Sequence, residues 1–363
     1  MVRAAVLSAP GERLRLAELE LPEPGPGQVR VQIAATGVCH SDLSLARGTL
    51  RSAMPVVLGH ESAGTVLSVG ADVTTCAPGD RVVLCWAPPC GACWFCAEDE
   101  PWLCERSSEA AGTPYATVDG VEVYPGLSTG GFAEQTVVSA RAVVRVPDAV
   151  PLEHAALVGC AVMTGVGAVL NTAKVRAGQS VLVVGLGGVG LSVVQGARLA
   201  GAGQVIVVDR SPDKLELART MGATDVLEAG GELAKQVRAL TGRRGADHAF
   251  DCVGQAETIR ACWSATRRGG TTTIVGIGGK EQQVSFTALE LFHFARTVQG
   301  CVYGSTDPLR DIPTILEHAA AGRIDLGALI TGTVGLDGID DAFEAMEAGQ
   351  GVRTVVLPQR SSP

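Results

Sequence analysis

The sequence predicts an α/β protein in which a β-rich region is followed by a mostly parallel sheet with helices on both faces. Its 363 residues suggest about two domains. The texture changes along the chain, from short strands broken by Gly and Pro before Pro151 to alternating strands and helices over 162–302. Hydrophobic residues make up 46% and charged residues 18%, which excludes an intrinsically disordered chain.

The N-terminal region is expected to form a barrel or sandwich, because its apolar runs are short and separated by turn-forming residues. Its predicted strands are Val2–Ser8, Val29–Ala35, Ala63–Val69 and Arg81–Trp86, with a turn-dense break at Pro22–Pro26.

The central region alternates short apolar runs with segments of helical spacing, the βαβαβ pattern of a parallel sheet. The predicted strands are Ser180–Val184, Val205–Val208, Asp225–Leu227, Ala246–Phe250 and Thr272–Val275. The predicted helices between them are Val189–Leu199, Lys214–Met221, Glu232–Leu240 and Thr258–Ala265. The C-terminal region predicts helices near Ile312–Ala321 and Ile339–Glu347 and a strand at Thr354–Leu357.

The net charge and the search for targeting signals indicate which partners and which location to expect. The net charge is −9 and there are no basic runs, which argues against nucleic acid or an anionic membrane as the main partner. The N-terminus lacks the apolar core of a signal peptide, and the longest run without a charged or amide residue, between His154 and Asn171, is too short for a membrane span. We expect a cytoplasmic, reducing location, in which the 11 cysteines do not form a disulfide framework.

A glycine motif follows the predicted strand Ser180–Val184. Residues 185–190 read Gly-Leu-Gly-Gly-Val-Gly, the G-x-G-x-x-G pattern, in which Gly185 permits the turn, Gly187 admits a pyrophosphate and Gly190 lets the helix pack closely. Asp209 ends the next strand and can bind ribose hydroxyls while repelling a 2′-phosphate, which favours NAD over NADP; Arg210 weakens that preference. The alternative is a glycine-rich turn with a surface aspartate.

Four cysteines lie close together in one short segment, with C-x2-C-x2-C-x7-C spacing. Four thiolates would close a tetrahedral zinc site with no open position, so this metal would be structural. Disulfides or a redox pair are the alternative. The cysteines are Cys90, Cys93, Cys96 and Cys104.

A second set of polar residues is spread along the chain: Cys39-His40-Ser41-Asp42, Gly59-His60-Glu61 and Cys160. Two cysteines and one histidine would leave the fourth position of a catalytic zinc open. Isolated residues of these types are nevertheless more often packing or surface groups, so the pattern alone is weaker than the four-cysteine segment.

With these motifs in place, the chain resembles the zinc-dependent alcohol dehydrogenases of the medium-chain dehydrogenase/reductase superfamily, over essentially its whole length. The motifs occur in this order: GVCHSD (37–42), GHESAGTVLSVG (59–70), GDRVV (79–83), the four-cysteine segment, GCAVMTG (159–165), GLGGVG (185–190), VVDRS (207–211), FDCVG (250–254) and VRTVV (352–356).

The resemblance implies a Rossmann doubly wound parallel sheet over 162–302, inserted in a GroES-like β-rich catalytic domain made of 1–161 and 303–363. It implies two Zn²⁺ per chain and NAD. Cys39, His60 and Cys160 would hold the catalytic zinc, Glu61 would lie beside it and Asp42 would orient His60. Ser41 would hydrogen-bond the alcohol, and Trp86 would line the substrate channel or simply pack. The implied cofactor-binding residues are His40, Thr164, Gly185, Gly187, Gly188, Val189, Gly190, Asp209, Arg210, Lys214, Val275 and Arg353.

The sequence also departs from the family pattern at several positions that bear on proton transfer, cofactor binding and substrate. Ser44 stands where animal members complete a proton relay with histidine, and His40 stands where some members carry arginine. The glutathione-dependent formaldehyde branch uses an arginine after the last loop cysteine; here Arg106 is two residues out of register, with Ser108 at the matching place. That activity, S-(hydroxymethyl)glutathione oxidation, therefore ranks second.

The leading hypothesis is NAD-dependent interconversion of an apolar primary alcohol, aliphatic or aromatic, and its aldehyde. A zinc-free reductase of the same superfamily is disfavoured, because such a site would not need Cys39, His60 and Cys160. A non-catalytic NAD- and zinc-binding structural protein is the alternative from another class. The resemblance implies at least a homodimer, with a homotetramer possible.

Overall fold

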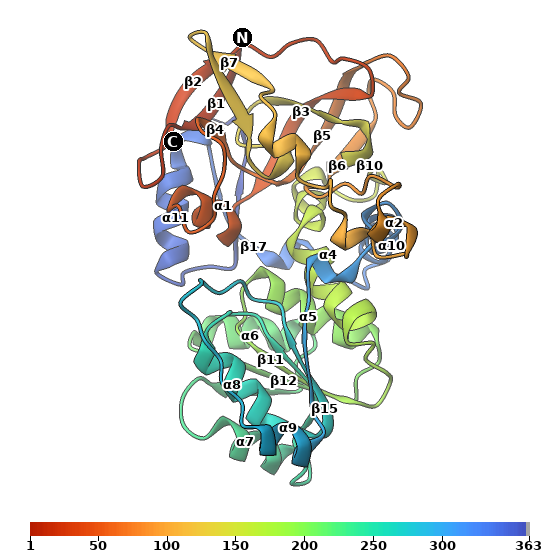
Figure 1. The fold of residues 1–363 in the computed structure, drawn as a ribbon, viewed down its shortest axis with the longest axis vertical. Coiled ribbons are helices and arrows are strands. Elements are labelled where there is room, and N and C mark those ends of the chain that lie inside the picture. Colours follow the sequence, from red (N-terminus) through yellow and green to blue (C-terminus); the bar gives the residue numbers. More distant parts are fainter. Residues whose placement is uncertain (361–363) are drawn as a thin grey trace. The chain divides into compact units, whose positions relative to one another are not determined.

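The computed structural model describes residues 1–360, and residues 361–363, which end the expected segment 303–363, lie outside the described part. The chain divides into two compact units (Figure 1). The first contains residues 1–161 together with the chain from 307 onward, and the second contains 162–306. Each unit is described by itself below.

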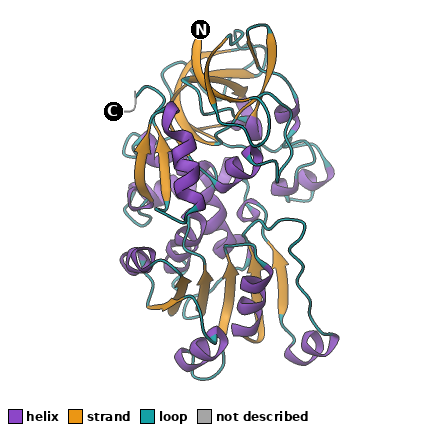
Figure 2. Ribbon diagram, turned by 90° about the vertical axis from the view of Figure 1, so that its left-hand side faces the viewer, coloured by secondary structure: helices purple, strands orange, loops and turns teal. Residues whose placement is uncertain are grey.

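The second unit is built on a six-stranded, all-parallel sheet in the order β13-β12-β11-β14-β15-β16. This order, with the first strand in the middle and the chain moving outward to either side, is that of a doubly wound dinucleotide-binding sheet. Figure 2 shows these strands side by side. The strands are β11 (Ser180–Val184), β12 (Gln204–Asp209), β13 (Asp225–Glu228), β14 (Ala246–Asp251), β15 (Thr266–Ile274) and β16 (Thr297–Gly300).

The helices of this unit begin and end where the sequence supplies suitable caps. In α6 (Pro212–Met221) a proline occupies the first position and Gly222 ends the helix at φ 119°, a conformation that costs glycine little. The α5 helix (Gly188–Leu199) buries most of its residues. The other helices are α4 (Ala161–Gly167, whose first residue belongs to the first unit), α7 (Leu233–Leu240), α8 (Ala256–Ala265) and α9 (Ala288–Phe294).

The first unit is rich in antiparallel strands. One sheet has the order β2-β1-β4-β8-β7; the other runs β10-β6-β5-β3-β18-β17, with β9 also paired to β3. Strand β3 carries alternating buried residues, including Val29, Val31 and Ile33, against the core. The strands are β1 (Val2–Leu7), β2 (Arg15–Leu19), β3 (Gln28–Gly37), β4 (Val56–Val57), β5 (Glu61–Val69), β6 (Arg81–Leu84), β7 (Ala116–Val118), β8 (Val121–Pro125), β9 (Gln135–Ser139), β10 (Val143–Arg145), β17 (Ile330–Val334) and β18 (Arg353–Val356).

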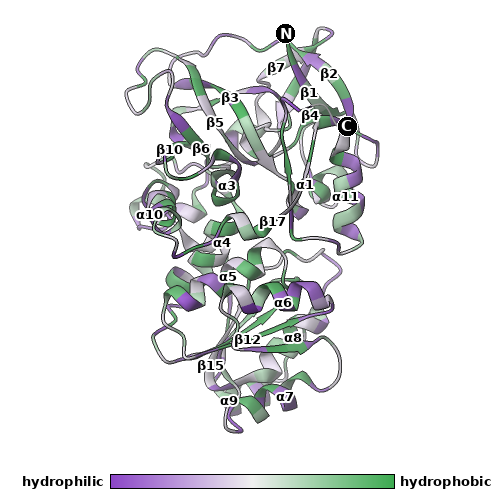
Figure 3. Ribbon diagram, turned by 180° about the vertical axis from the view of Figure 1, so that it is seen from behind, coloured by the Kyte–Doolittle hydropathy of each residue, from purple (hydrophilic) through white to green (hydrophobic). Residues whose placement is uncertain are grey.

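Helix α11 (Ile339–Glu347) of the first unit packs one apolar face into the core. It alternates green and purple in Figure 3, and its buried residues are Ile339, Ala342 and Phe343. The other helices are α1 (His40–Ala46), α2 (Trp94–Ala97), α3 (Leu152–Ala155) and α10 (Pro308–Ala320). Strand β18 returns from the C-terminal part of the chain to pair with β3. The predicted fold class, a parallel dinucleotide-binding sheet combined with a GroES-like β-rich domain, is confirmed.

No single helix in residues 1–360 is both long and apolar enough to cross a membrane, although one bent pair of short helices, Leu152–Gly159 and Ala161–Thr172, passes by length and composition.

Candidate functional site

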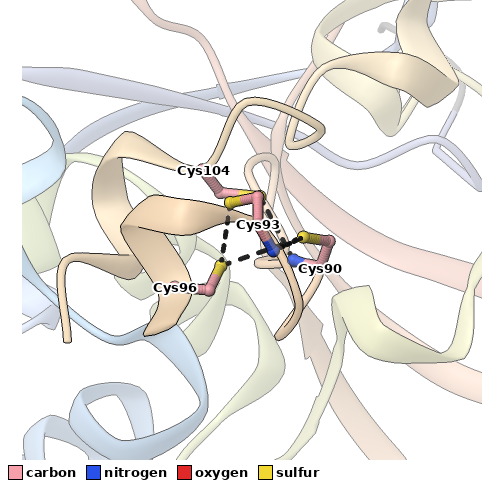
Figure 4. Close-up of side chains that lie close together, drawn as sticks. All are labelled: Cys90, Cys93, Cys96 and Cys104. Atoms are coloured by element: carbon pink, nitrogen blue, oxygen red, sulfur yellow. Dashed lines mark hydrogen bonds between the residues drawn. The ribbon is translucent and has the colours of Figure 1, made fainter. Parts of the chain in front are cut away.

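The first site is the four-cysteine segment. Figure 4 shows the side chains of Cys90, Cys93, Cys96 and Cys104 converging, and one ligand atom from each lies within 4.8 Å of all the others. The Sγ atoms of Cys93 and Cys96 are 3.5 Å apart, and those of Cys90 and Cys96 are 3.9 Å apart. All four are free thiols, so the alternative of disulfides finds no support in this geometry.

Backbone amides prepare this segment for a cation. Hydrogen bonds from the N–H groups of Ala92 and Cys93 to the Cys90 sulfur, at 3.4 and 3.2 Å, favour its thiolate and lower the pKa of Cys90 to about 6. Thiolate is the form of cysteine that binds zinc. The four sulfur donors and the thiolate character of Cys90 therefore fit a structural Zn²⁺.

The second site brings together residues that are far apart in the sequence. Ligand atoms of Cys39, His60, Glu61 and Cys160 all lie within 4.8 Å of one another. Cys39 precedes the first turn of α1, and Cys160 precedes α4. His60 immediately precedes β5, and Glu61 is the first residue of that strand. Exposure is 6% for Cys39, 1% for His60, 0% for Glu61 and 9% for Cys160, so the cluster is enclosed by protein.

Asp42 connects two of these ligands. One carboxylate oxygen lies 3.0 Å from His60 Nδ1 and accepts the Gly59 N–H at 2.9 Å. The other accepts the Cys39 N–H at 3.3 Å. With Nδ1 engaged, Nε2 is the ring atom of His60 left for a ligand, and it is buried with no hydrogen-bond partner within the described residues.

Glu61 and Arg353 form a buried ion pair beside this cluster. A guanidinium nitrogen of Arg353 lies 3.4 Å from a Glu61 oxygen and 4.0 Å from Cys39 Sγ. Burial raises the pKa of Glu61 to about 8, although the Arg353 charge opposes that rise. A hydrogen bond with Cys160, helped by the Arg353 charge, lowers the pKa of the Cys39 thiol.

These observations fit a metal ion. An orphaned imidazole nitrogen, a thiol biased toward thiolate and a carboxylate are gathered in one buried place, where unpaired polar groups are costly. Two cysteines and one histidine form the three-ligand set of catalytic zinc sites, with Glu61 as a further oxygen donor nearby.

Sequence reasoning missed two features of this site. The first is the role of Gly37: a Cβ there would contact Oε2 of Glu61 and lie 2.9 Å from Leu157 Cδ2. The signal was available, since Gly37 opens the GVCHSD motif. The second is the contact of Arg353 with Glu61, because the resemblance implied only a cofactor contact for that arginine.

The remaining predicted site residues of the first unit differ in their exposure and contacts. His40 and Ser41 are the first two residues of α1; His40 is exposed and Ser41 is partly exposed. The Trp86 ring meets the His60 ring edge-on, at 6.4 Å between centroids and 83° between planes. Trp86 therefore lies beside His60, one of the predicted metal ligands.

The glycine motif adopts the geometry that its sequence predicts. Gly185 has φ +91°, and a Cβ on Gly190 would collide with the Gly185 carbonyl oxygen. A Cβ on Gly187 would meet no protein atom within 4 Å, so a ligand could approach the backbone there. The motif also includes Gly188 and Val189, the first residues of α5.

Asp209 lies at the end of β12 and faces this turn. One of its oxygens accepts the Leu186 N–H at 2.6 Å and the other accepts the Ser211 N–H at 2.9 Å. The other predicted cofactor-binding residues of this unit are distributed as follows: Arg210 is exposed, Lys214 on α6 and Thr164 on α4 are partly exposed, and Val275 is buried after β15.

Together, the nucleotide-binding sheet and the two cysteine-based clusters define a metal-dependent dehydrogenase. Comparisons with known proteins agree. Residues 25–148 match the model of the alcohol dehydrogenase GroES-like domain, and residues 188–321 match that of the zinc-binding dehydrogenase domain. The chain is 39% identical to S-(hydroxymethyl)glutathione dehydrogenase of Escherichia coli O1:K1 over 365 residues, which cover 98% of this chain and 99% of that protein.

Solved structures are similar over nearly the whole chain. An alcohol dehydrogenase zinc-binding domain protein from Burkholderia ambifaria has a TM-score of 0.93 at 31% identity and covers 99% of both chains. Benzyl alcohol dehydrogenase from Acinetobacter calcoaceticus has a TM-score of 0.92 at 28% identity and covers 98% of this chain and 99% of its own. This chain belongs to the zinc-binding alcohol dehydrogenase family of the medium-chain dehydrogenase/reductase superfamily.

Proposed function

We propose that this protein oxidises an apolar primary alcohol to its aldehyde with NAD, and catalyses the reverse reaction. The observation that carries the proposal is the buried cluster of Cys39, His60 and Cys160, in which His60 Nε2 has no hydrogen-bond partner in the described chain. When bound, zinc would lower the pKa of the substrate hydroxyl and NAD would accept the hydride from carbon.

The protein's own residues would prepare this reaction. Cys39, His60 and Cys160 would hold the metal, and Asp42, 3.0 Å from His60 Nδ1, would fix the ring in the tautomer that leaves Nε2 free. The Ser41 hydroxyl would accept the proton from the alcohol and pass it outward. Arg353 would hold Glu61 at the edge of the cluster, 3.4 Å away.

The second unit would supply the cofactor site. Gly187 leaves room for the pyrophosphate, and the N-terminus of α5 offers backbone N–H groups to it. The Asp209 carboxylate would accept hydrogen bonds from the adenosine ribose, which favours NAD over NADP. Lys214 would contact the phosphates and ribose, and Thr164 would pack against the nicotinamide.

The substrate would be apolar if Trp86 lines its binding site, because an indole excludes polyols and favours aromatic or aliphatic chains. The similarity to benzyl alcohol dehydrogenase supports an aromatic primary alcohol as the first compound to test. We expect NADH formation from NAD and benzyl alcohol by the purified protein, which should contain two zinc ions per chain.

The matched variants are Cys160→Ala and Cys76→Ala, both buried cysteines of the same unit. Cys160→Ala should abolish turnover while NADH still binds, and Cys76→Ala, outside both clusters, should keep both metals and turnover. Normal turnover by Cys160→Ala would show that the proposed zinc site is not the catalytic one.

A second candidate is oxidation of S-(hydroxymethyl)glutathione, which the names of several relatives at 39% identity favour. Against it, the Arg106 guanidinium is already paired with Glu109 at 2.8 Å, and Ser108 carries no charge for a carboxylate. Comparing kcat/KM for benzyl alcohol with that for formaldehyde plus glutathione decides between them. A strict requirement for glutathione would replace the first proposal with the second.

A further inference from the structure

We infer that Thr129 is a positioning residue for the metal ligand His60, acting through the carbonyl group of Gly59; the inference rests on the proposed function. Thr129 is fully buried, and its hydroxyl donates a hydrogen bond to the Gly59 oxygen at 2.7 Å. The hydroxyl bonds to backbone carbonyl oxygens, those of Gly59 and Gly126, and not to a ligand atom.

The argument starts from the peptide group that joins Gly59 to His60. Because a peptide group is planar, the direction of the Gly59 carbonyl also fixes the His60 nitrogen and Cα, the atom from which the His60 side chain leaves the backbone. Two donors hold that oxygen, the Thr129 hydroxyl and the Gly131 N–H, each at 2.7 Å. The Thr129 hydroxyl also lies 3.3 Å from the Gly126 oxygen, which is a longer contact than the one to Gly59.

Gly59 needs this restraint because of its own conformation. Its φ is +88°, a region in which glycine has little intrinsic preference and turns easily. A Cβ at this position would lie 2.7 Å from the Phe132 nitrogen, so no stiffer residue can replace it. Asp42 fixes the peptide before Gly59 through the Gly59 N–H, and Thr129 fixes the peptide after it.

The segment that carries Thr129 is itself held in place. Leu127 and Ser128, at φ 47° and 63°, are two consecutive non-glycine residues in the left-handed region, a conformation that is strained for L-residues with a side chain. Such strain persists only where the surroundings fix the backbone. Here the Thr136 hydroxyl donates to the Thr129 carbonyl at 2.6 Å, and the Thr36 hydroxyl donates to the Gly131 carbonyl at 2.9 Å.

The structure therefore gives one ligand a two-sided support: a carboxylate on the ring and on one peptide, and a buried hydroxyl on the other peptide. Loss of the hydroxyl would leave the Gly59 oxygen with a single donor. The peptide group between Gly59 and His60 could then change its orientation. The metal affinity of the site should then fall, as it does when groups that orient metal ligands are removed.

The test uses Co²⁺ added to the full-length protein after selective removal of the catalytic metal, with zinc kept in the four-cysteine site. In Thr129→Val, which keeps the size of the side chain, we expect Co²⁺ affinity to drop about tenfold and the visible absorption of bound Co²⁺ to change. Thr129→Ser keeps the hydroxyl and should stay within about twofold of the parent protein. If Thr129→Val does not fold, Thr129→Ala replaces it in the same measurement.

The matched control is Thr266→Val in the second unit, a buried threonine whose hydroxyl donates to the Cys262 carbonyl at 2.8 Å. It should lower stability without changing Co²⁺ affinity. Parental affinity and spectrum in Thr129→Val would overturn the inference. Failure of the parent to bind metal at Cys39, His60 and Cys160 would overturn the proposed function as well, whereas metal binding without alcohol turnover would overturn the function alone.

Discussion

The Nδ1 atom of His60 lies 3.0 Å from a carboxylate oxygen of Asp42, and the side chains of both residues are 1% exposed. The same carboxylate also accepts the N–H groups of Gly59 and Cys39. One buried aspartate thus fixes the ring of His60 and the backbone of Cys39 and Gly59. The pair belongs to a single unit of the fold, so its geometry does not depend on how the two units are placed.

Asp42→Asn should weaken the catalytic metal site without emptying the structural one. The amide has one acceptor oxygen in place of two, so at least one of the three donors loses its partner. We expect a 10- to 100-fold loss of affinity for the catalytic zinc, measured by competition with a chelator. Asp80→Asn, in an exposed turn where the carboxylate accepts only the Ala77 N–H and pairs with Arg145, should keep the parental affinity.

For the four-cysteine site we expect that a substitution removes the structural zinc. Cys96→Ser should reduce the metal content from two zinc ions to one and make the segment from Cys90 to Cys104 sensitive to proteases. The segment has little apolar core, since Trp94 is 62% exposed and α2 buries no residue. Cys76→Ser, with its sulfur outside both clusters, should retain two zinc ions. Unchanged metal content in Cys96→Ser would mean that the four cysteines do not form one site.

Asp247 predicts a pH-dependent contribution to stability. Hydrogen bonds from the Ser180 backbone and side chain and from Arg267 outweigh the effect of burial and lower the pKa of Asp247 to about 2. A depressed carboxyl pKa stabilises the folded state above the unfolded pKa of about 4, and the effect disappears as pH falls toward 2. After discounting for partial exposure, the contribution is about 1 kcal/mol.

The measurement is urea unfolding of the parent and of Asp247→Asn between pH 3 and 7. The difference in unfolding free energy should be constant from pH 5 to 7 and shrink below pH 4. A difference that grows on acidification would contradict the sign of the pKa shift. Asp213→Asn, at an exposed position on α6, should not reproduce the pH dependence.

Much of the fold could be predicted because local patterns and tertiary structure agree. Ser180–Val184 and Ile339–Glu347 have the predicted bounds, since an apolar run and an amphipathic run are each bounded by turn residues. Strand β16 and helix α9 were not predicted. The apolar residues of 288–300 follow neither a clear helical period nor a clear two-residue strand period. Strand β16 forms because β15 offers it an edge.

The site could be predicted only in part, for a similar reason. The four cysteines are close in sequence and their spacing alone indicates a metal. Cys39, His60 and Cys160 come from separate elements and were grouped by resemblance, because no local pattern records that a fold brings them together. The supports of the site, Gly37 and Thr129, are invisible for the same reason: their roles depend on contacts with Glu61 and Gly59 across the domain.

Asp209 should control the choice of cofactor. Its carboxylate lies at the glycine turn, where a 2′-phosphate would meet a like charge. Asp209→Asn removes that charge, so we expect weaker NADH binding and a higher relative affinity for NADPH, helped by the neighbouring Arg210. Fluorescence titration of both cofactors measures this ratio. If the ratio of NADH affinity to NADPH affinity in Asp209→Asn equals that of the parent protein, another residue controls the choice of cofactor.

We predict that the expected homodimer forms through a surface of the second unit. Strand β16 is an outer strand of the parallel sheet, and the adjacent helix α9 exposes Leu289 and Phe292 at 71% and 84%. An open strand edge beside large apolar side chains favours pairing with another chain.

Phe292→Glu places a charge on this surface, so the mass in solution should fall from about twice the 37.2 kDa chain to that of one chain. Val121→Glu, at a 55% exposed position in the first unit, should leave the mass unchanged, and light scattering after gel filtration measures both. A dimer that survives Phe292→Glu would place the interface on another face, because a buried, unpaired carboxylate costs several kcal/mol in an apolar contact.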